Sequence, residues 1–561
     1  MKLSTPRVDM VKVLSSCFLF VVASCLLLMQ SLMAQEVTQG NLVSVNWLEK
    51  NLTSADVLVL DASPPQLYAA QHIPGAVSVN IYAYGVKEMP VAVTEQLYQS
   101  WGVSTGKKLV IYDQGGSMNA TRVFFTLYYD GFPVKDLLLL DGGIAKWQQV
   151  GLPVTKDPTP APTKGSFKIT KSNEDVRAKL PEVLTASGDP ANNALLDALD
   201  ADWHFGEVQV FDRPGHIPNG ILLPTTDFYN TDKTFKSPEE IKKMLNYLGV
   251  KPDQQIYTYC GGGVAACVPF FALKFVLNYP KVKLFKESEM GWLQDERRLP
   301  YWTYDAPSLM RETGWLQIWG GRMIRMYGGS QVSIVDVRPA EAFNQGHLPF
   351  ALNIPADVFK NNFSKPEKLA EILGPAGVDA SHEAVVISGA GLTKESALAY
   401  LMLEKLGQKK VSVFIDSIDN RYAKNPFGGF AVTKQATAVG AKKSPMDLSI
   451  PPTMYPVNFR KDVLIADPKS TKGLYPKVFI ASGNTMPAQA QNGTVVHVPY
   501  AGLLNSDGTP KAAKDIWNIL VKAGVPRYAE LVCFSDDPGE AAVNYFILKL
   551  MGYPDVKVLV M

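Results

Sequence analysis

Hydrophobic and polar positions follow one order four times along the chain. Each copy contains a 13-residue segment with Gly-Val at its second and third places, and the segment ends in an apolar strand followed by a polar or glycine-rich turn. The segments are WGVSTGKKLVIYD (Trp101 to Asp113), LGVKPDQQIYTYC (Leu248 to Cys260), AGVDASHEAVVIS (Ala376 to Ser388) and AGVPRYAELVCFS (Ala523 to Ser535). An apolar stretch of helical length comes next, and then a further strand. This recurrence predicts four internal repeats.

The first three copies share an upstream pattern in which a short strand ends in an acid and a histidine turn follows. The acids are Asp61, Asp197 and Asp336, and the histidines are His72, His216 and His347. Because both residue types recur in copies that carry no nucleophile, we expect the histidines to fix the turn through hydrogen bonds and the acids to cap or brace it. The fourth copy matches this part of the pattern only loosely.

Strands that alternate with helices predict right-handed crossovers and a mainly parallel sheet. The predicted fold class is α/β, with four tandem domains, each a mainly parallel sheet with helices on both faces. Linkers are expected where Pro, Thr, Lys and Gly gather without apolar period, at residues 155–165, near Pro307 and at residues 433–445. The predicted domains span residues 35–160, 161–308, 309–438 and 439–561.

The first 34 residues are typical of an export signal. Arg7 and Lys12 precede an apolar run over residues 13–29, and cleavage is expected after Ala34. The mature chain would then be exported, as a periplasmic protein without a membrane span. Two alternatives stay open: an uncleaved run that anchors the chain, and lipoprotein processing that leaves a lipid on Cys25.

Composition and charge restrict the function classes. The chain has 561 residues, with 55 basic and 53 acidic side chains and a formal charge of +2, so nothing indicates nucleic acid as a partner. Removal of the signal leaves Cys260, Cys267 and Cys533, too few for a disulfide scaffold. The six histidines and these cysteines show no metal-ligand spacing, so we expect neither a metal nor another cofactor. Cys267 and Cys533 are expected in the core.

Cys260 carries the candidate chemistry because it ends a predicted strand and precedes three glycines. In a parallel α/β sheet, the ligand site lies beyond the carboxyl ends of the strands. Backbone amides of the turn and the following helix N-terminus can form an anion cradle around the sulfur. We expect this cradle to lower the pKa of the thiol and to hold a thiolate. Such a thiolate can attack a sulfur atom and form a persulfide stabilised by the same donors.

The segments YCGGGVAAC, GHIPNGILLP, HIPGA and LDGGIAKW resemble those of the rhodanese superfamily of sulfurtransferases, over nearly the whole mature chain. The arrangement is similar to tandem proteins in which an inactive rhodanese domain precedes an active one. The resemblance implies that Cys260 takes sulfane sulfur from thiosulfate or 3-mercaptopyruvate and passes it to a thiol, to cyanide or to a sulfur-acceptor protein. It assigns donor binding to Gly261, Gly262, Gly263, Val264 and Ala265.

The loop CGGGVA resembles the uncharged mercaptopyruvate loop CGSGVT more than the basic thiosulfate loop, with departures. Gly262 and Ala265 stand where the mercaptopyruvate enzymes have serine and threonine. Leu199 stands where the family has a donor-binding arginine, and Arg213 is the candidate replacement. Asp61 and His72 occupy positions that resemble the partners of the missing serine, so the donor stays open.

The other three copies replace the nucleophile with Asp113, Ser388 and Ser535, so we predict one active site among four domains. The Ser388 loop keeps its glycines and is a candidate anion site. A phosphatase or arsenate reductase on a related fold is opposed by Ala266, which stands where such a loop needs an arginine. The alternative function is a non-turnover sulfur carrier or scaffold with rhodanese modules.

Overall fold

Four five-stranded sheets make up the chain in the computed structural model, which describes residues 40–84, 89–418, 450–486 and 493–561. The strand orders are β1-β5-β4-β2-β3, β6-β10-β9-β7-β8, β11-β15-β14-β12-β13 and β16-β20-β19-β17-β18, so one topology is used four times. Neighbouring strands pair in parallel, for example Val59 with Val110 and Leu195 with Tyr257. The predicted α/β fold with four tandem domains, each built on a parallel sheet, is confirmed.

The first two domains have the following elements. The first contains β1 (Leu42–Val43), α2 (Val45–Asn51), β2 (Val57–Asp61), α3 (Pro65–Ala70), β3 (Val77–Ser78), α4 (Ile81–Tyr84), α5 (Val91–Ser100), β4 (Lys108–Tyr112), α6 (Asn119–Tyr129), β5 (Leu137–Leu140) and α7 (Gly143–Gln149). The second contains β6 (Arg177–Ala178), α8 (Leu180–Gly188), β7 (Asn193–Asp197), α9 (Ala201–His204), β8 (Gly220–Leu222), α10 (Pro238–Tyr247), β9 (Gln255–Tyr259), α11 (Cys267–Phe271), β10 (Val282–Phe285) and α12 (Ser288–Leu293). A π-helical turn, η4 (Ala272–Val276), extends α11.

The last two domains repeat the order of strands, but the described residues of the fourth contain no helix between β16 and β17. The third contains β11 (Met310–Arg311), α13 (Thr313–Trp319), α14 (Arg322–Met326), β12 (Val332–Asp336), α15 (Ala340–Gln345), β13 (Ala351–Asn353), α16 (Ala356–Asn361), α17 (Ala370–Leu373), β14 (Glu383–Ile387), α18 (Lys394–Leu406) and β15 (Lys410–Phe414). The fourth contains β16 (Leu464–Ile465), β17 (Lys477–Ala481), β18 (Thr494–His497), α19 (Ala513–Ala523), β19 (Glu530–Phe534), α20 (Pro538–Leu550) and β20 (Val556–Leu559).

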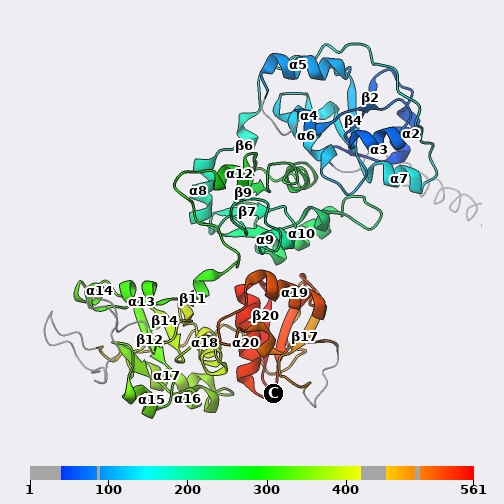
Figure 1. The fold of residues 1–561 in the computed structure, drawn as a ribbon. Coiled ribbons are helices and arrows are strands. Elements are labelled where there is room, and N and C mark those ends of the chain that lie inside the picture. The colour runs from blue at the N-terminus through cyan, green and yellow to red at the C-terminus, as the bar shows by residue number, and fades with distance from the viewer. Residues whose placement is uncertain (1–39, 85–88, 419–449, 487–492) are drawn as a thin grey trace, which may run out of the picture. The chain divides into compact units, whose positions relative to one another are not determined.

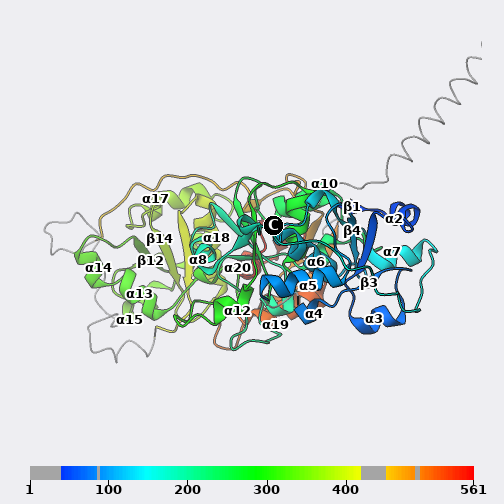
Figure 2. The same ribbon diagram turned by 90° about the horizontal axis from the view of Figure 1, so that it is seen from above.

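Central strands are apolar along most of their length because helices cover both faces of each sheet. Strands β4, β9 and β14 are buried at every position after the first. In the third domain, α13 and α17 lie on opposite sides of β12 and β14 in both views (Figures 1 and 2). Leu316 of α13 and Phe343 of α15 pack on one face of this sheet, against Ile334 and Val385. Cys260 follows directly on one of these buried strands, β9.

The fourth copy is blurred in sequence but has the same strand order as the other three. Its central strand β19 is buried throughout, and Cys533 lies inside it with no exposed surface, as expected. Sheet formation depends on apolar strands and their spacing, and both persist in this copy. The strand order is therefore retained although the turn residues that make the motif recognisable, and the helix between the first two strands, are not.

The chain divides into two compact units, each described by itself. One comprises the described residues up to Asp200 together with Leu222–Lys242 and Pro252–Asp295, and it contains Cys260. The other comprises Ala201–Ile221, Lys243–Lys251 and the described residues from Glu296 onward. The sheets fall within the four predicted residue ranges, whose ends stay predictions.

Two sequence expectations lie outside the described residues: the export signal over residues 1–34 and the linker over residues 433–445. Among the residues that the structure does describe, none of the helices has both the length and the apolar character needed to cross a bilayer.

Candidate active site at the Cys260 loop

The Cys260 loop, residues 260–266, starts where strand β9 ends. The backbone N–H of Gly263 donates to Sγ of Cys260 at 3.1 Å, so the sulfur accepts a hydrogen bond from its own loop. The amides of Gly262 and Ala266 also favour the charged form of the sulfur. Convergence of main-chain donors on the sulfur is therefore present, which makes the loop an anion cradle.

Gly263 is the glycine that the loop geometry requires. Its φ is +79°, and a Cβ at this position would lie 2.3 Å from the carbonyl oxygen of Lys286. Gly262 has no positive φ, and a Cβ there would meet only the flexible end of Met290, at 3.2 Å. The loop can thus approach the chain after β10 closely at Gly263 and at no cost in backbone strain.

Ser288, which begins α12, is a site residue that sequence reasoning missed. Its hydroxyl accepts a hydrogen bond from the backbone N–H of Cys260 at 3.1 Å, donates to the carbonyl of Phe285 at 2.8 Å and lies 3.9 Å from Sγ of Cys260. Ser288 has a φ of +52°, unusual for a residue with a side chain. An alignment of the first two copies on the buried residues Trp147 and Trp292 would have pointed to Ser288, because it aligns Ser288 with Gly143.

Arg122 on α6 is the second missed residue. It is 1% exposed, and its Nη1 donates to the carbonyl oxygen of Gly263 at 2.9 Å. The thiol of Cys267, which is fully buried as expected, donates to the same oxygen at 3.4 Å. These two donors hold the carbonyl of Gly263, while the N–H of the same residue faces the sulfur of Cys260. A buried arginine in the apolar stretch NATRVFF was the available sequence signal.

The expectation of a lowered thiol pKa at Cys260 is wrong. The side chain is 2% exposed, and burial raises its pKa above the ordinary value. The amides of Ala266, Gly262 and Gly263 and the hydroxyl of Ser288 lower the pKa by less than burial raises it. The thiol is therefore protonated at neutral pH. Burial also raises the pKa of Cys267, to about 12.

A cavity of about 290 Å³ is lined by Arg122, whose guanidinium also donates to the carbonyl of Gly263 in the loop. Its lining includes the cationic side chains of Arg122, Arg177 and Lys286 and the anionic side chains of Asp130 and Glu174. Arg177 forms an ion pair with Glu287. The lining of this cavity therefore carries charged groups of both signs, three of them cationic.

Comparisons with known proteins identify the family of the chain. The model of the rhodanese-like domain matches residues 44–150, 180–295 and 322–423, more than half of the chain. The chain belongs to the rhodanese family.

Curated relatives carry sulfur-transfer names. A putative thiosulfate sulfurtransferase of Synechococcus elongatus is 30% identical over 48% of this chain and 85% of its own length. A sulfur carrier protein, TtuD, of Thermus thermophilus is 29% identical over 45% of this chain and 93% of its own length. Among solved structures, the 3-mercaptopyruvate sulfotransferase SseA of Escherichia coli is 28% identical, with a TM-score of 0.40, over 44% of this chain and 98% of its own. Sulfur transfer in general is the activity that the two curated relatives support.

The strand-end residues of the other rhodanese copies bond within their own loops. Asp113 accepts hydrogen bonds from the amides of Gly115 and Ala120, at 2.8 and 2.9 Å. Ser388 donates to the carbonyl of Gly391 at 3.2 Å, and Ser535 donates to Glu540 at 2.6 Å. None of these three side chains is a thiol, so Cys260 is the one thiol among the four corresponding strand-end residues.

The remaining predicted loop residues hold the start of the following helix. The carbonyls of Val264 and Ala265 accept from the amides of Cys267 and Val268, at 3.1 and 3.0 Å. Gly261 is held at its carbonyl, which accepts from Met290 at 3.1 Å. These bonds fix the loop between α11 and α12. Their role in donor binding stays a prediction.

Arg213, the candidate replacement for the family arginine, contacts another set of residues. Its Nη1 donates to the carbonyl of Leu299 at 2.7 Å, and its guanidinium lies 5.7 Å from the ring centroid of Tyr301. These bonds position Arg213 on the turn that carries His216. A part in donor binding stays a prediction.

The predicted braces are confirmed. The strand-end acids Asp61, Asp197 and Asp336 each accept from the backbone N–H two residues further on, at 2.8, 3.1 and 3.0 Å. The histidines His72, His216 and His347 each bond through Nδ1 to a backbone carbonyl at 2.9 Å. These groups fix turns, as their recurrence indicated.

Proposed function

We propose that the chain is a sulfurtransferase that moves sulfane sulfur from thiosulfate or 3-mercaptopyruvate, through a persulfide on Cys260, to a thiol or cyanide. The observation that carries the proposal is the hydrogen bond from the Gly263 amide to Sγ of Cys260 at 3.1 Å. A donor in this position stabilises negative charge on the sulfur and, with small shifts, on a second sulfur bound to it.

The proposed transfer has two steps. Sγ of Cys260 attacks the outer sulfur of thiosulfate, the S–S bond of the donor breaks, and sulfite leaves with the bonding electron pair and the proton of the thiol. The persulfide anion that remains is then attacked by cyanide at its outer sulfur. Thiocyanate leaves, and the Cys260 sulfur recovers its electron pair and a proton from water.

The raised pKa of Cys260 indicates which form of the sulfur the loop donors stabilise. The resting thiol is neutral and compatible with its burial, whereas sulfur transfer creates an anion inside the loop. A persulfide is more acidic than a thiol, so the amides and the Ser288 hydroxyl would act mainly on the loaded form. The loop is thus suited to hold the intermediate more than to activate the free enzyme.

The proposed donor is a small anion. Support comes from the cavity lined by Arg122, which donates to the loop carbonyl of Gly263, and by Arg177 and Lys286. Electrostatic attraction in such a concave site raises the local concentration of anions. Both candidate donors carry the required charge, and Gly262 and Ala265 remove the hydroxyls by which the resemblance would have favoured mercaptopyruvate.

A non-turnover sulfur carrier is the second candidate function. The observation that favours it is the 2% exposure of Cys260, which limits access of large acceptors to the sulfur. The Thermus thermophilus relative named as a sulfur carrier adds to this support. In this case a sulfur-acceptor protein would discharge the persulfide, and the three copies without a nucleophile would offer docking surface.

Export is proposed on the residues outside the described part of the chain. Cleavage after Ala34 would release a periplasmic protein, and processing at Cys25 would instead leave a lipid-anchored one. N-terminal sequencing of the protein from a periplasmic fraction tests this proposal. We expect a mature chain that begins at residue 35. A lipid on Cys25 would instead indicate lipoprotein processing, and an intact Met1 would contradict both kinds of cleavage.

The decisive experiment measures turnover with two donors. Purified chain is given thiosulfate with cyanide, or 3-mercaptopyruvate with a thiol, and thiocyanate or pyruvate is counted per chain. Repeated release is expected for an enzyme, and a single equivalent identifies a carrier. Cys260→Ser should abolish both, whereas Cys533→Ala, a core change remote in sequence from the loop, should retain turnover. Equal loss in both variants would contradict the assignment.

A further inference from the structure

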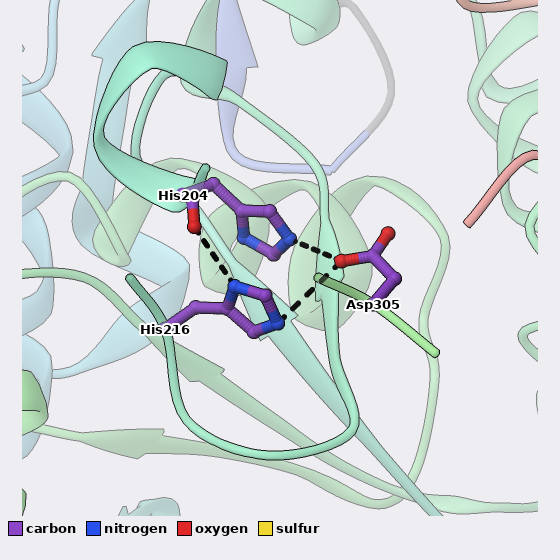
Figure 3. Close-up of side chains that lie close together, drawn as sticks. All are labelled: His204, His216 and Asp305. Carbon is purple, nitrogen blue, oxygen red and sulfur yellow. Dashed lines mark hydrogen bonds and ion pairs between the residues drawn. The ribbon is translucent and has the colours of Figure 1, made fainter. Parts of the chain in front are cut away.

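Three ligand-type side chains meet at the histidine turn of the second rhodanese copy, in the unit that does not contain Cys260 (Figure 3). Nε2 of His204 lies 2.6 Å from Oδ1 of Asp305, and Nε2 of His216 lies 3.5 Å from the same oxygen. One ligand atom from each residue lies within 4.8 Å of the others. In the described part of the chain, this is the one such group of three.

The hydrogen bonds determine which nitrogen of His216 carries a proton. Its Nδ1 lies 2.9 Å from the backbone carbonyl of His204, which can only accept, so Nδ1 carries the hydrogen. In the neutral ring, the other nitrogen, Nε2, is then unprotonated. Nε2 therefore presents a lone pair.

The lone pair on Nε2 of His216 faces another hydrogen-bond acceptor. The side chain of His216 is fully buried, and Nε2 has no hydrogen-bond partner. Figure 3 marks the contact of this nitrogen with the Asp305 carboxylate, 3.5 Å away, which is also an acceptor. Two acceptors that face each other in a buried place are unfavourable unless a cation lies between them.

The other copies show what this turn looks like without such a requirement. His72 stacks on Tyr68 and His347 stacks on Phe343, with ring centroids 3.9 and 3.8 Å apart, and each Nδ1 bonds to the carbonyl of its stacking partner. In the second copy the stacking partner is His204, at 3.6 Å. The arrangement is the same, but a ring without a nitrogen has been replaced by an imidazole.

The group opposite the histidine has changed as well. In the first copy, the segment that pairs with the turn through His72 and Thr155 brings the Thr159 hydroxyl to 3.4 Å from Nε2 of His72. A hydroxyl can donate to that nitrogen. In the second copy, the segment that pairs through His216 and Trp302 brings Asp305 instead. An ionised carboxylate cannot donate. At this turn, both the stacking ring and the group opposite the histidine have therefore been replaced by residues of types that bind metal ions.

The turn and the carboxylate are held in place by close contacts. Gly215 has a φ of +120°, and a Cβ there would lie 2.0 Å from the carbonyl oxygen of Trp302. Oδ2 of Asp305 packs against Gly552, where a Cβ would lie 1.8 Å from it. The Asp305 side chain is 19% exposed, which leaves one side of the group open to water.

We propose that Nε2 of His204, Nε2 of His216 and a carboxylate oxygen of Asp305 bind a divalent transition-metal ion of the zinc type. Two imidazoles and one carboxylate, with a position open to solvent, form a donor set that such ions prefer. The Nδ1–H of His216 bonds to a backbone carbonyl, as the second nitrogen of a metal-bound histidine commonly does.

Binding requires two small adjustments. The imidazole planes are parallel to within 1°, so they must tilt for both lone pairs to point at one ion. Nε2 of His204 must give up the proton that it shares with Asp305, which is released or moves to Nδ1. The ion would fasten the segment that carries Asp305 to the histidine turn. This site is independent of the sulfur chemistry proposed for Cys260.

The test uses full-length, tag-free chain that carries Cys260→Ser, so that this thiol cannot bind metal. After removal of metal, the protein is dialysed against Zn²⁺ and the bound zinc is counted, and Co²⁺ is added separately to record its visible absorption. His204→Phe reproduces the stacking ring of the third copy and removes one ligand. We expect one zinc per chain that is bound at least about tenfold more weakly by His204→Phe and by Asp305→Asn.

His382→Asn is the matched control, because Nε2 of His382 lies 3.7 Å from Asp379 and forms a histidine–carboxylate pair without a third ligand. It should bind zinc like the parent, and zinc should raise the melting temperature of the parent and the control but not of His204→Phe. Unchanged zinc affinity in His204→Phe, or no zinc bound by the parent, would overturn the proposal. The melting curve of metal-free His204→Phe shows whether this variant is folded.

Discussion

The loops of Cys260 and Asp113 occupy the same place in successive rhodanese copies, but their amides bond to different groups, a thiol and a carboxyl group. Asp113 supplies a carboxylate that two amides of its own loop hold, at 2.8 and 2.9 Å. Cys260 supplies a neutral thiol that accepts from the Gly263 amide. Burial raises the pKa of both side chains, so each relies on loop donors to carry charge. The Asp113 loop directs two amides at a carboxyl group, and the Cys260 loop directs one at a sulfur on which the proposed transfer creates an anion.

Cys260→Asp gives the sharpest test of this difference, because it converts the second loop to the residue of the first. The loop should keep an anion and the fold should persist, but no sulfur can be accepted. Sulfur transfer should fall at least about a thousandfold, as expected when a nucleophile is removed. The measurement is thiocyanate release, with melting temperature as the check on folding. Residual transfer near the parent rate would mean that another group accepts the sulfur.

Gly263→Ala should cause the next largest loss. The methyl group meets the carbonyl of Lys286 at 2.3 Å in a left-handed conformation, so the loop must shift and the amide must leave the sulfur. We expect transfer to fall about tenfold or more, the typical cost of a lost oxyanion donor being larger still. Gly262→Ala is the matched comparison, and its smaller loss should follow from contact with Met290 alone. Equal rates in the two variants would contradict the role of the Gly263 amide.

The pH dependence of Cys260 reactivity separates the resting thiol from an activated thiolate. Because the folded pKa is raised, the thiol stays protonated at neutral pH and becomes reactive only as pH rises through and above its ordinary range. Alkylation by iodoacetamide, followed at the peptide that contains Cys260, should rise about tenfold per pH unit from pH about 7 to about 9. A rate already at its plateau at pH about 7 would show that the loop lowers the pKa after all.

Ser288→Ala should have the smallest effect. The substitution removes the acceptor of the Cys260 amide and the hydroxyl 3.9 Å from its sulfur, but it leaves the Gly263 amide in place. One hydrogen bond corresponds to about a fivefold change in rate or less. The decrease should appear in the formation of the persulfide under single-turnover conditions. Ser288→Gly, which restores the residue of the first copy, tests whether relief of the positive φ changes stability in the opposite direction.

The repeat pattern allowed much of the fold to be predicted. Spacing along the chain determines strand, turn and helix locally, so the parallel sheets, the strand-end place of Cys260 and the braces at Asp61 and His72 followed from it. The fourth sheet also formed where the motif was blurred, because apolar strands and not turn residues build the core.

Contacts between distant segments were beyond the sequence pattern. Arg122 reaches Gly263 across 141 positions, and His204 reaches Asp305 across 101. No local spacing reports such pairs, which explains why metal-ligand spacing was absent from the sequence while a candidate set exists in the fold. The pKa of Cys260 was mispredicted because the loop shows its donors in the sequence, whereas the burial that outweighs them depends on the whole domain.

The most direct test of the Cys260 loop is the mass of its peptide after a single exposure to donor. The chain is incubated with thiosulfate or 3-mercaptopyruvate, quenched and digested, and all cysteine-containing peptides are weighed. We predict that the Cys260 peptide gains the mass of one sulfur atom, while the peptides of Cys267 and Cys533 do not change. An unmodified Cys260 peptide with both donors, or sulfur on another cysteine instead, would contradict a persulfide held by this loop.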